Sequence, residues 1–465
     1  MTRLIPALPR LLLLLIGARA GAATSTSPVD VALYPSLQAA IDANPGRILQ
    51  IPAQDYTISE ALKITAAGTE LHGPARIVQI NPGEPMVRIE NTQDIVISDL
   101  AFTRGEGRQE ATQAGIDIIK CSGVELFRLR VTENHTHSSI RARASSDVTV
   151  EDCTVINYKG PTIDDRTASP LMGYAFRSID GTGIQFLGVQ GGVIRNNRIE
   201  EHRLWPTKAV RDKYDLGTLT VVPKKAAPLL EQAILDAKYT NNWHQGAGIQ
   251  VTTPEEAQRV IITGNYIEHP AQGLDIHADN VTVANNIICY AMIGMKTMHG
   301  AKHVLINANQ FMYCDLWGVL LQPGAASHAA SNGDSGRKAA KENVDGGTIV
   351  SNNIFSDFGF GDQYWNWVDH HNDYPERNVI IVLFGQLAQN PPIRDILITG
   401  NLVYDSGRDT VLLNGKWTKA APRYHYALYV EQHRQPAPVN VRAYGNLLNP
   451  GMDGASNFTI AQEPR

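Results

Sequence analysis

A short pattern of apolar and polar residues follows four glycines in the middle of the chain. The first and third residues after each glycine are apolar, apart from Thr297, and the second and fourth are mostly polar. The four copies occupy residues 248–252, 273–277, 294–298 and 318–322. Successive copies begin roughly 20 to 25 residues apart, and a repeat of this length is typical of a solenoid in which each repeat forms one coil.

A second kind of short apolar run lies between these copies and ends before an asparagine. The asparagines in this context are Asn197, Asn265, Asn286, Asn309, Asn353, Asn401 and Asn446. We predict that they stack as a ladder whose amides satisfy backbone groups of the turns. Two or three short strands in each coil predict an all-β fold, a single-stranded right-handed parallel β-helix.

The pattern also predicts which side chains face inward. Successive side chains of a strand point to opposite faces, so the first and third residues of each copy are expected to line the interior and the others to face solvent. The outward positions are Gln250, Asp275, Lys296 and Leu320, followed by Thr252, His277, Met298 and Gln322. Adjacent coils lie about 4.8 Å apart. We therefore predict that Asp275, His277 and Lys296 form one compact, exposed cluster.

The same outward column extends upstream, and the coil pattern is interrupted in three places. The upstream members are Asp117, Arg141, Arg143 and Gln185. The interruptions are residues 160–180, 205–245 with a helix-like run at 228–239, and 323–346. Insertions in a solenoid crowd one face, often the binding face. Helical spacing of Leu37, Ala40 and Ile41 predicts an N-terminal capping helix within residues 36–48.

The N-terminus has the features of a signal peptide. Arg3 and Arg10 flank a short apolar run that ends at Ile16, and small residues follow up to Ala23. This pattern predicts a signal peptide over residues 1–23 and one β-helix domain over 24–465. No later segment approaches eighteen apolar residues, so no membrane insertion is expected. The protein is predicted to be exported, to the periplasm or the extracellular space.

Composition narrows the class of partner. The formal net charge is −5 and the isoelectric point is about 6.3, which disfavours nucleic acid as a partner. The cysteines show neither a metal-like spacing nor the density of a disulfide scaffold. Cys289 and Cys314 follow asparagines of adjacent coils, so they either meet across the stack or remain as two thiols in the core. No cofactor is expected. Calcium stays open as an alternative, although no calcium-site spacing is evident.

The whole organisation resembles the pectin-lyase-like superfamily, whose members are mostly enzymes and binding proteins for polysaccharides. Residues 273–277, Gly-Leu-Asp-Ile-His, resemble the Gly-x-Asp-Pro-His segment of mannuronan 5-epimerases. In that family the aspartate and histidine lie in the active groove with a tyrosine and a lysine. Asp275 and His277 match, whereas Ile276 replaces the proline and Gln272 stands where the family has tyrosine. Lys296 is placed by the stacking of coils and not by the motif.

These residue types favour a lyase or 5-epimerase that acts on a uronate-containing glycan. Removing the proton at carbon 5 of a uronate requires a base, a cation for the developing enolate, and an acid. We assign Asp275, His277 and Lys296 as the catalytic candidates. The candidates for substrate binding are Arg141, Arg143, Gln185, Gln250, His244, Trp365 and Trp367.

Two alternatives stay open. A glycoside hydrolase needs two carboxylates roughly 5 to 9 Å apart, and it would have to recruit Asp315, Asp279 or Asp369 beside Asp275. A non-catalytic carbohydrate-binding or adhesin-like solenoid would use Trp365 and Trp367 to stack on sugars and would leave the charged column as a solvated face. We expect His299 and His303 to be turn residues, and a packed loop position is the alternative for His244.

Overall fold

The protein is described here by a computed structural model. It describes residues 27–165, 168, 173–205, 207–221, 232–240, 242–253, 256–333, 338–358, 377–404, 410–419 and 422–459. The predicted signal peptide, Trp365, Trp367 and Asp369 lie outside these residues. No helix of the described part is long and apolar enough to cross a membrane.

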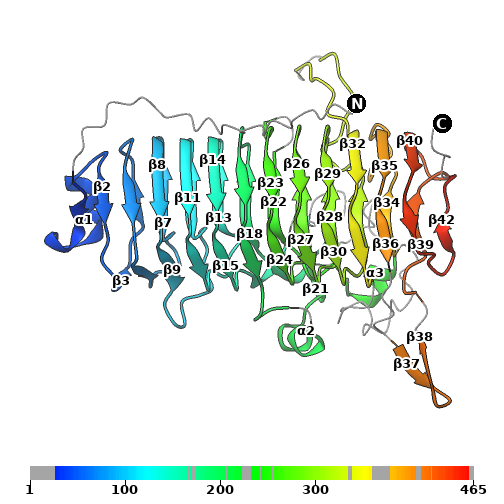
Figure 1. Ribbon diagram of the computed structural model, residues 1–465, viewed down its shortest axis with the longest axis horizontal. Helices are drawn as coiled ribbons and strands as arrows, with labels where there is room; N and C mark the ends of the chain where they lie inside the picture. The colour runs from blue at the N-terminus through cyan, green and yellow to red at the C-terminus, as the bar shows by residue number, and fades with distance from the viewer. Residues whose placement is uncertain are drawn as a thin grey trace, which may run out of the picture.

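Three long parallel sheets wind around one axis and form the solenoid (Figure 1). Sheet A contains β1 (Val29–Asp30), β2 (Ile48–Gln50), β5 (Glu70–His72), β8 (Gln93–Ser98), β11 (Ser122–Phe127), β14 (Ser146–Glu151), β19 (Val193–Arg195), β23 (Ile261–Thr263), β26 (Thr282–Ala284), β29 (Leu305–Asn307), β32 (Gly346–Ser351), β35 (Arg394–Thr399) and β40 (Val439–Tyr444). Sheet B contains β3 (Asp55–Ile58), β6 (Arg76–Gln79), β9 (Ala101–Arg104), β12 (Arg130–Thr132), β15 (Thr154–Ile156), β20 (Arg198–Glu200), β24 (Tyr266–Glu268), β27 (Ile287–Cys289), β30 (Gln310–Met312), β33 (Ile354–Ser356), β36 (Leu402–Tyr404) and β41 (Leu447–Leu448).

Sheet C carries the glycine-led repeats. Its strands are β4 (Leu62–Ile64), β7 (Val87–Glu90), β10 (Ile116–Ile119), β13 (Ser138–Arg143), β18 (Thr182–Leu187), β22 (Ala247–Thr252), β25 (Gln272–Ile276), β28 (Ile293–Thr297), β31 (Trp317–Leu321), β34 (Asn378–Val382), β39 (Tyr426–Val430) and β42 (Gly454–Ser456). Leu274 pairs with Met295 and Met295 with Val319 in register, and all three are fully buried. The predicted inward column is therefore confirmed.

Polar ladders and an end cap complete the coil stack. Asn265 Nδ2 donates to Asn286 Oδ1 over 2.9 Å, and the same contact continues to Asn309, so the predicted asparagine ladder is confirmed. The cap is α1 (Leu37–Ala43), which follows the short 3-10 helix η1 (Val31–Leu33). The Ser36 side chain accepts from Ala39 N at the start of α1, and the apolar face of the helix is buried over the first coils.

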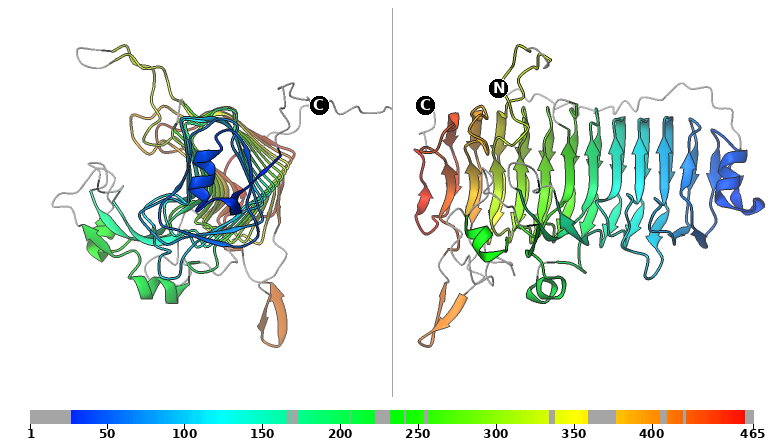
Figure 2. Two further views of the ribbon diagram at one scale, coloured as in Figure 1. Left: turned by 90° about the vertical axis from the view of Figure 1, so that its left-hand side faces the viewer. Right: turned by 180° about the vertical axis from the view of Figure 1, so that it is seen from behind.

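The insertions leave the solenoid at the two edges of sheet C. Between sheets B and C emerge β16 (Gly160–Asp164), β17 (Ala175–Asp180), α2 (Lys208–Tyr214), β21 (Leu219–Val221), α3 (Gln232–Ala237), and the hairpin β37 (Thr410–Leu413) and β38 (Lys416–Lys419). Strands β16, β17 and β21 form a small antiparallel sheet. The segment between β31 and β32 leaves at the opposite edge. The end-on view of Figure 2 shows these green and yellow elements projecting from the solenoid, and by connectivity sheet C lies between them.

The four cysteines are all free and buried. Cys289 and Cys314 are therefore two thiols and not a disulfide, which decides between the two expectations. Burial raises the pKa of the Cys289 thiol to about 11. The role of these residues is packing.

Candidate functional site

The parallel register of sheet C brings the predicted catalytic residues together. Asp275 on β25 pairs with Gln250 on β22 and with Lys296 on β28. His277 follows directly after β25. The glycine-led repeat places these residues at equivalent positions of successive coils, so their side chains emerge on the same face. The clustering predicted from the sequence is therefore present in the structure.

Three polar groups surround the Asp275 carboxylate. Gln250 Nε2 donates to Oδ2 over 2.9 Å, His277 Nε2 lies 2.7 Å from Oδ1, and Lys296 Nζ lies 3.5 Å from Oδ1. Burial alone would raise the pKa of Asp275. The charges of His277 and Lys296 outweigh it and hold this pKa well below its ordinary value of 3.8. Asp275 is therefore a fixed, ionised counter-charge.

The predicted exposure of the cluster is wrong. Asp275 is 4% exposed and His277 is 8% exposed, whereas Lys296 keeps 16% of its side chain accessible. Alternation along a strand decides which face a side chain points to, but not whether that face is covered. Here His299, from the turn after β28, packs on His277. Lys296 is the member of the trio that solvent reaches best.

The His277 ring is held from both sides. Its Nε2 faces Asp275, and its Nδ1 lies 3.1 Å from Thr252 Oγ1 on the neighbouring coil. A carboxylate at Nε2 favours the proton on that nitrogen, so Nδ1 is the acceptor when the ring is neutral. Thr252 is partly exposed, so the acceptor nitrogen faces the accessible side of the cluster. Asp275 acts on any substrate through His277 and Lys296 and is a positioning residue.

His299 joins the cluster, although we expected a plain turn residue. Its ring packs edge to face on His277 with centroids 4.4 Å apart. Burial, followed by the charges of His277 and Lys296, lowers the pKa of His299 to about 3, so the ring is neutral. The Ala326 N–H donates to Nδ1 over 3.2 Å, and the ring proton must then sit on Nε2. Among the described residues Nε2 has no hydrogen-bond partner.

The turn that carries His299 is supported by residues distant in sequence. Asn343 Nδ2 donates to His299 O over 2.8 Å, and the Asp345 carboxylate accepts from Gly300 N and Ala301 N over 3.0 and 3.2 Å. A Cβ at Gly324 would lie 2.3 Å from His299 Nδ1, so the ring packs directly on backbone. Burial raises the pKa of Asp345 from its ordinary value of 3.8 to about 7 despite these bonds.

We expect Asp345→Asn to be tolerated and Asp345→Ala to be destabilising by at least about 1–3 kcal/mol, because alanine leaves two buried N–H groups unpaired. The folded-state pKa of Asp345 lies above the unfolded one, so its contribution to stability is complete below pH 3.8 and is lost as the pH rises through about 7. Thermal unfolding at about pH 5 and about pH 8 measures this effect. Wild type should lose stability relative to the asparagine variant at the higher pH. A constant difference would contradict the assignment.

Upstream of Asp275 the column continues as a chain of side-chain hydrogen bonds. Gln185 Nε2 donates to Gln250 Oε1 over 2.5 Å, and Ser138 Oγ donates to Gln185 Oε1 over 2.6 Å. Gln250 in turn donates to Asp275. Both glutamines are partly exposed, so they form a polar floor one and two coils from Asp275, as their assignment to substrate binding requires.

The two arginines of the column are held by a common partner. Arg141 Nε lies 3.0 Å from Asp117 Oδ1, and Arg143 Nη2 lies 2.8 Å from Asp117 Oδ2. Asp117 is 1% exposed, which corrects the expectation that it faces solvent. One carboxylate cannot neutralise two guanidiniums, so a net positive charge remains there. Three coil spacings of about 4.8 Å place these arginines roughly 14 Å from Asp275 along the outer face of sheet C.

His244 is not a groove residue. It is fully buried beside Trp243, and its Nε2 lies 2.9 Å from the Nζ of the buried Lys159. Burial lowers the pKa of Lys159 to about 7 and that of His244 well below its ordinary value. This pair joins the start of the insertion at residues 160–180 to the end of the insertion at residues 205–245. The expectation that His244 binds substrate is therefore wrong, and its packed-loop alternative is confirmed.

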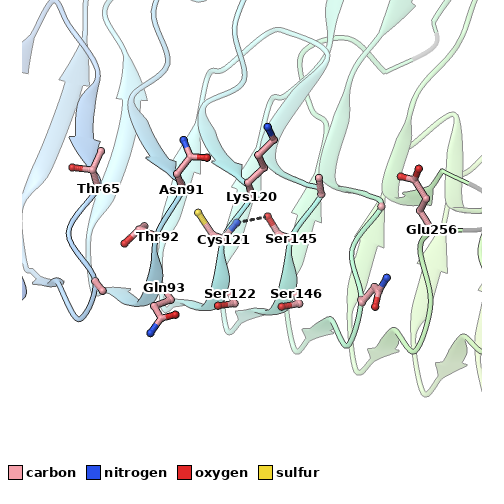
Figure 3. Close-up of a pocket in the computed structure, with 14 residues that line it drawn as sticks. Thr65, Asn91, Thr92, Gln93, Lys120, Cys121, Ser122, Ser145, Ser146 and Glu256 are labelled. Atoms are coloured by element: carbon pink, nitrogen blue, oxygen red, sulfur yellow. Dashed lines mark hydrogen bonds between the residues drawn. The ribbon is translucent and has the colours of Figure 1, made fainter.

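Two cavities in the described part lie away from Asp275. One of about 790 Å³ follows the turns from sheet C to sheet A and is lined by Lys120, Cys121 and Ser145 among others (Figure 3). Another, of about 310 Å³, lies between sheets B and C near Glu110, His135 and Asp180. Neither is lined by the Asp275 cluster. The described residues contain no group of three or more His, Cys, Asp or Glu that could hold a metal ion.

Comparisons with known proteins establish the fold. No family model and no curated protein matches the sequence. The catalytic domain of a GH87 alpha-1,3-glucanase, in complex with nigerose, is similar with a TM-score of 0.54 and 11% identity, over 94% of this chain and 68% of that chain. The family 28 exopolygalacturonase of Yersinia enterocolitica gives a TM-score of 0.50 at 12% identity, over 90% and 79%.

An alginate lyase in complex with G6 is similar with a TM-score of 0.48 and 11% identity, over 96% of this chain and 90% of that chain. The chain is thus a right-handed parallel β-helix, as predicted from its repeats, and its fold resembles that of the glucanase and the exopolygalacturonase. Such distant likenesses define the fold alone. The reaction has to be argued from the site.

Proposed function

We propose that the protein acts on a uronate-containing polysaccharide and removes the proton at carbon 5 of a uronate, as a lyase or a 5-epimerase. The observation that carries this proposal is the composition of the cluster on sheet C. A lysine and two imidazoles converge there around one carboxylate, and that carboxylate is already neutralised. This set matches the need for a base, a cation and a proton donor.

Each accessible group has a role in this reaction. Lys296 neutralises the substrate carboxylate as negative charge develops on it, which is the largest single contribution expected. His277, oriented by Asp275, takes the carbon 5 proton at Nδ1 after a substrate displaces the Thr252 hydroxyl. His299 donates a hydrogen bond from Nε2. In a lyase the electron pair then forms the carbon 4–carbon 5 double bond and expels the glycosidic oxygen, which takes a proton from water and leaves as a hydroxyl group. In an epimerase a proton from water returns to carbon 5 on the opposite face.

A glycoside hydrolase is less well supported. It requires one protonated and one ionised carboxyl at the sugar, and Asp275 is ionised and shared among its neighbours. Burial raises the pKa of Asp315 to about 7, which would suit a general acid, but Asp315 is 0% exposed and does not reach a sugar. Asp279 pairs with Lys302 at 3.4 Å. The glucanase and the exopolygalacturonase described above are glycan-cleaving enzymes by name, but at 11% and 12% identity they show the fold alone, so the choice of reaction rests on the site.

Charge along the outer face of sheet C supports a polyanionic substrate. Outward positions of β4, β7, β10 and β13 carry more cations than acids. The cations are Lys63, Arg88, Arg141 and Arg143, and the acids are Glu90 and Asp117. Three strand spacings from β13 to β4 span about 14 Å. An excess of positive charge over that length attracts a chain of carboxylates, although the whole protein is acidic.

The purified protein should be incubated with mannuronan, with polygalacturonate and with a neutral glucan. We expect turnover of a uronate polymer and none of the glucan, because only uronates have an acidic carbon 5 proton. New ultraviolet absorbance identifies a lyase, and altered uronate composition without cleavage identifies an epimerase. New reducing ends without absorbance would show a hydrolase instead. Glycan binding with no product from any polymer would favour a carbohydrate-binding solenoid.

A further inference from the structure

The outer face of sheet C changes character directly after Lys296. From β13 to β28 the central outward position is polar in every strand, whereas in β31 and β34 it is apolar. Lys296 pairs with Leu320 and Leu320 with Ile381 in register. Leu320 is 2% exposed and Ile381 is 0% exposed, although both point away from the solenoid interior. The space above the sheet is therefore filled at these strands.

These outward side chains form an apolar wall with its own packing. Leu320, Ile381 and Leu383 make a cluster with the partly buried Trp317, Phe384 and Tyr429, separate from the solenoid core. Trp317 also packs on the cluster that contains Trp243 and Phe176 of the insertions. The wall is thus continuous with the insertions at one edge of sheet C. It lies one strand spacing, about 4.8 Å, from Lys296.

In the strands of sheet C, accessible cations lie on one side of this wall only. The Arg143 side chain is 40% exposed, Arg141 is 21% exposed and Lys296 is 16% exposed. The next outward residue, Leu320, is 2% exposed. The face is not evenly open, because Asp275 is 4% exposed, but beyond Lys296 the central outward residues of β31 and β34 are at most 2% exposed. The charged side chains of sheet C that a glycan can contact therefore lie on the arginine side of Lys296 and not on the Leu320 side.

We infer that the protein binds the end of a glycan chain, with the terminal sugar at Lys296 against Leu320 and the rest of the chain extending toward Arg141 and Arg143. This inference rests on the proposed function and adds where along the glycan chain the enzyme acts. The enzyme acts on the terminal linkage or the terminal uronates and not at random along a polymer. Leu320 is then a residue that determines this end specificity.

The test uses a uronate hexasaccharide tagged with a bulky fluorophore at the reducing end or at the non-reducing end. We expect the tag at one end to weaken binding about ten-fold or more and the tag at the other end to change it little, because one end must fit against the wall. With a long polymer, we expect one small product, or change confined to the terminal residues. The polymer should keep its length early in the reaction.

Variants of the wall connect this result to Leu320. Leu320→Ala shortens the wall and should restore binding of the hexasaccharide whose tag weakens binding to wild type. Leu320→Met keeps the side-chain volume and should keep the difference in affinity between the two tagged hexasaccharides. Ile349→Ala, on the outer face of sheet A, is the matched control and should leave binding unchanged. Circular dichroism of each variant separates lost folding from lost specificity.

Equal tolerance of both tags, or internal cleavage of the polymer at early times, would overturn end binding and leave the proposed function standing. If no untagged uronate oligosaccharide binds or reacts, the proposed function fails and end binding fails with it. If Leu320→Met loses the discrimination while staying folded, the wall is not its cause.

Discussion

Replacing Lys296 by methionine is expected to lower turnover of a uronate polymer by about 10²–10³-fold while the protein stays folded. The ammonium is the accessible cation of the cluster, and methionine keeps the length of its apolar stem without the charge. Lys296 is not a core residue, and Asp275 keeps His277 at 2.7 Å and Gln250 at 2.9 Å as partners. The loss should appear mainly in kcat, because the charge is needed most as the enolate forms.

The two coils that hold Asp275 and Lys296 also provide a matched control for Lys296→Met. Lys302 forms an ion pair with Asp279 at 3.4 Å, just as Lys296 does with Asp275 at 3.5 Å, but it lies in the turn toward sheet A. Lys302→Met should therefore leave turnover within about two-fold, because surface ion pairs contribute little. Initial rates of both variants on the identified substrate make the comparison. Near-normal turnover by folded Lys296→Met would place the reaction elsewhere.

Removing the Asp275 carboxylate is expected to cost both stability and activity. Asp275→Ala leaves His277 and Lys296 facing each other without their counter-charge, and breaking a buried ion pair in this way costs about 3–5 kcal/mol. Asp275→Asn should keep most of the packing but lose the orientation and charge of His277, which lowers turnover by roughly 10²–10⁴-fold. Asp275→Ala should lose both stability and turnover.

The pH dependence distinguishes this charge effect from a packing defect. The folded-state pKa of Asp275 lies below 3.8, so the stability it contributes is present above that pH and is lost as the pH falls through the folded-state value. Wild type and Asp275→Asn should therefore differ in Tm at neutral pH and converge in acid. Asp279→Asn is the control and should shift Tm little. A difference between wild type and Asp275→Asn that is the same at every pH would contradict the role of charge.

Much of the fold follows from the sequence because the repeat fixes two things together. The glycine-led copies set the length of a coil, and alternation after each glycine sets which residues face inward. Together they place Asp275 beside Gln250 and Lys296 without any long-range information. The capping helix is local as well, since Ser36 and three apolar residues define it.

The rest of the site depends on contacts that local patterns do not encode. The burial of Asp275 and His277 involves the turn that carries His299, and the repeat does not set the path of that turn. His299 has a φ of +62° and looks like a turn residue, and its importance appears only when Ala326 and Asn343 are seen to hold it. In the sequence, only its position in the coil after His277 indicates that His299 belongs to the cluster. His244 is buried through its pairing with Lys159, 85 residues earlier.

The central claim, removal of the carbon 5 proton by the cluster on sheet C, is tested most directly by proton nuclear magnetic resonance of a polyuronate incubated with the protein in D₂O. A lyase destroys the carbon 5 proton signal by forming the double bond, and an epimerase replaces that proton with deuterium. We predict loss of this signal with wild type and with Lys302→Met, and its retention with Lys296→Met. Release of shorter chains with the carbon 5 proton intact would contradict the account and establish a hydrolase.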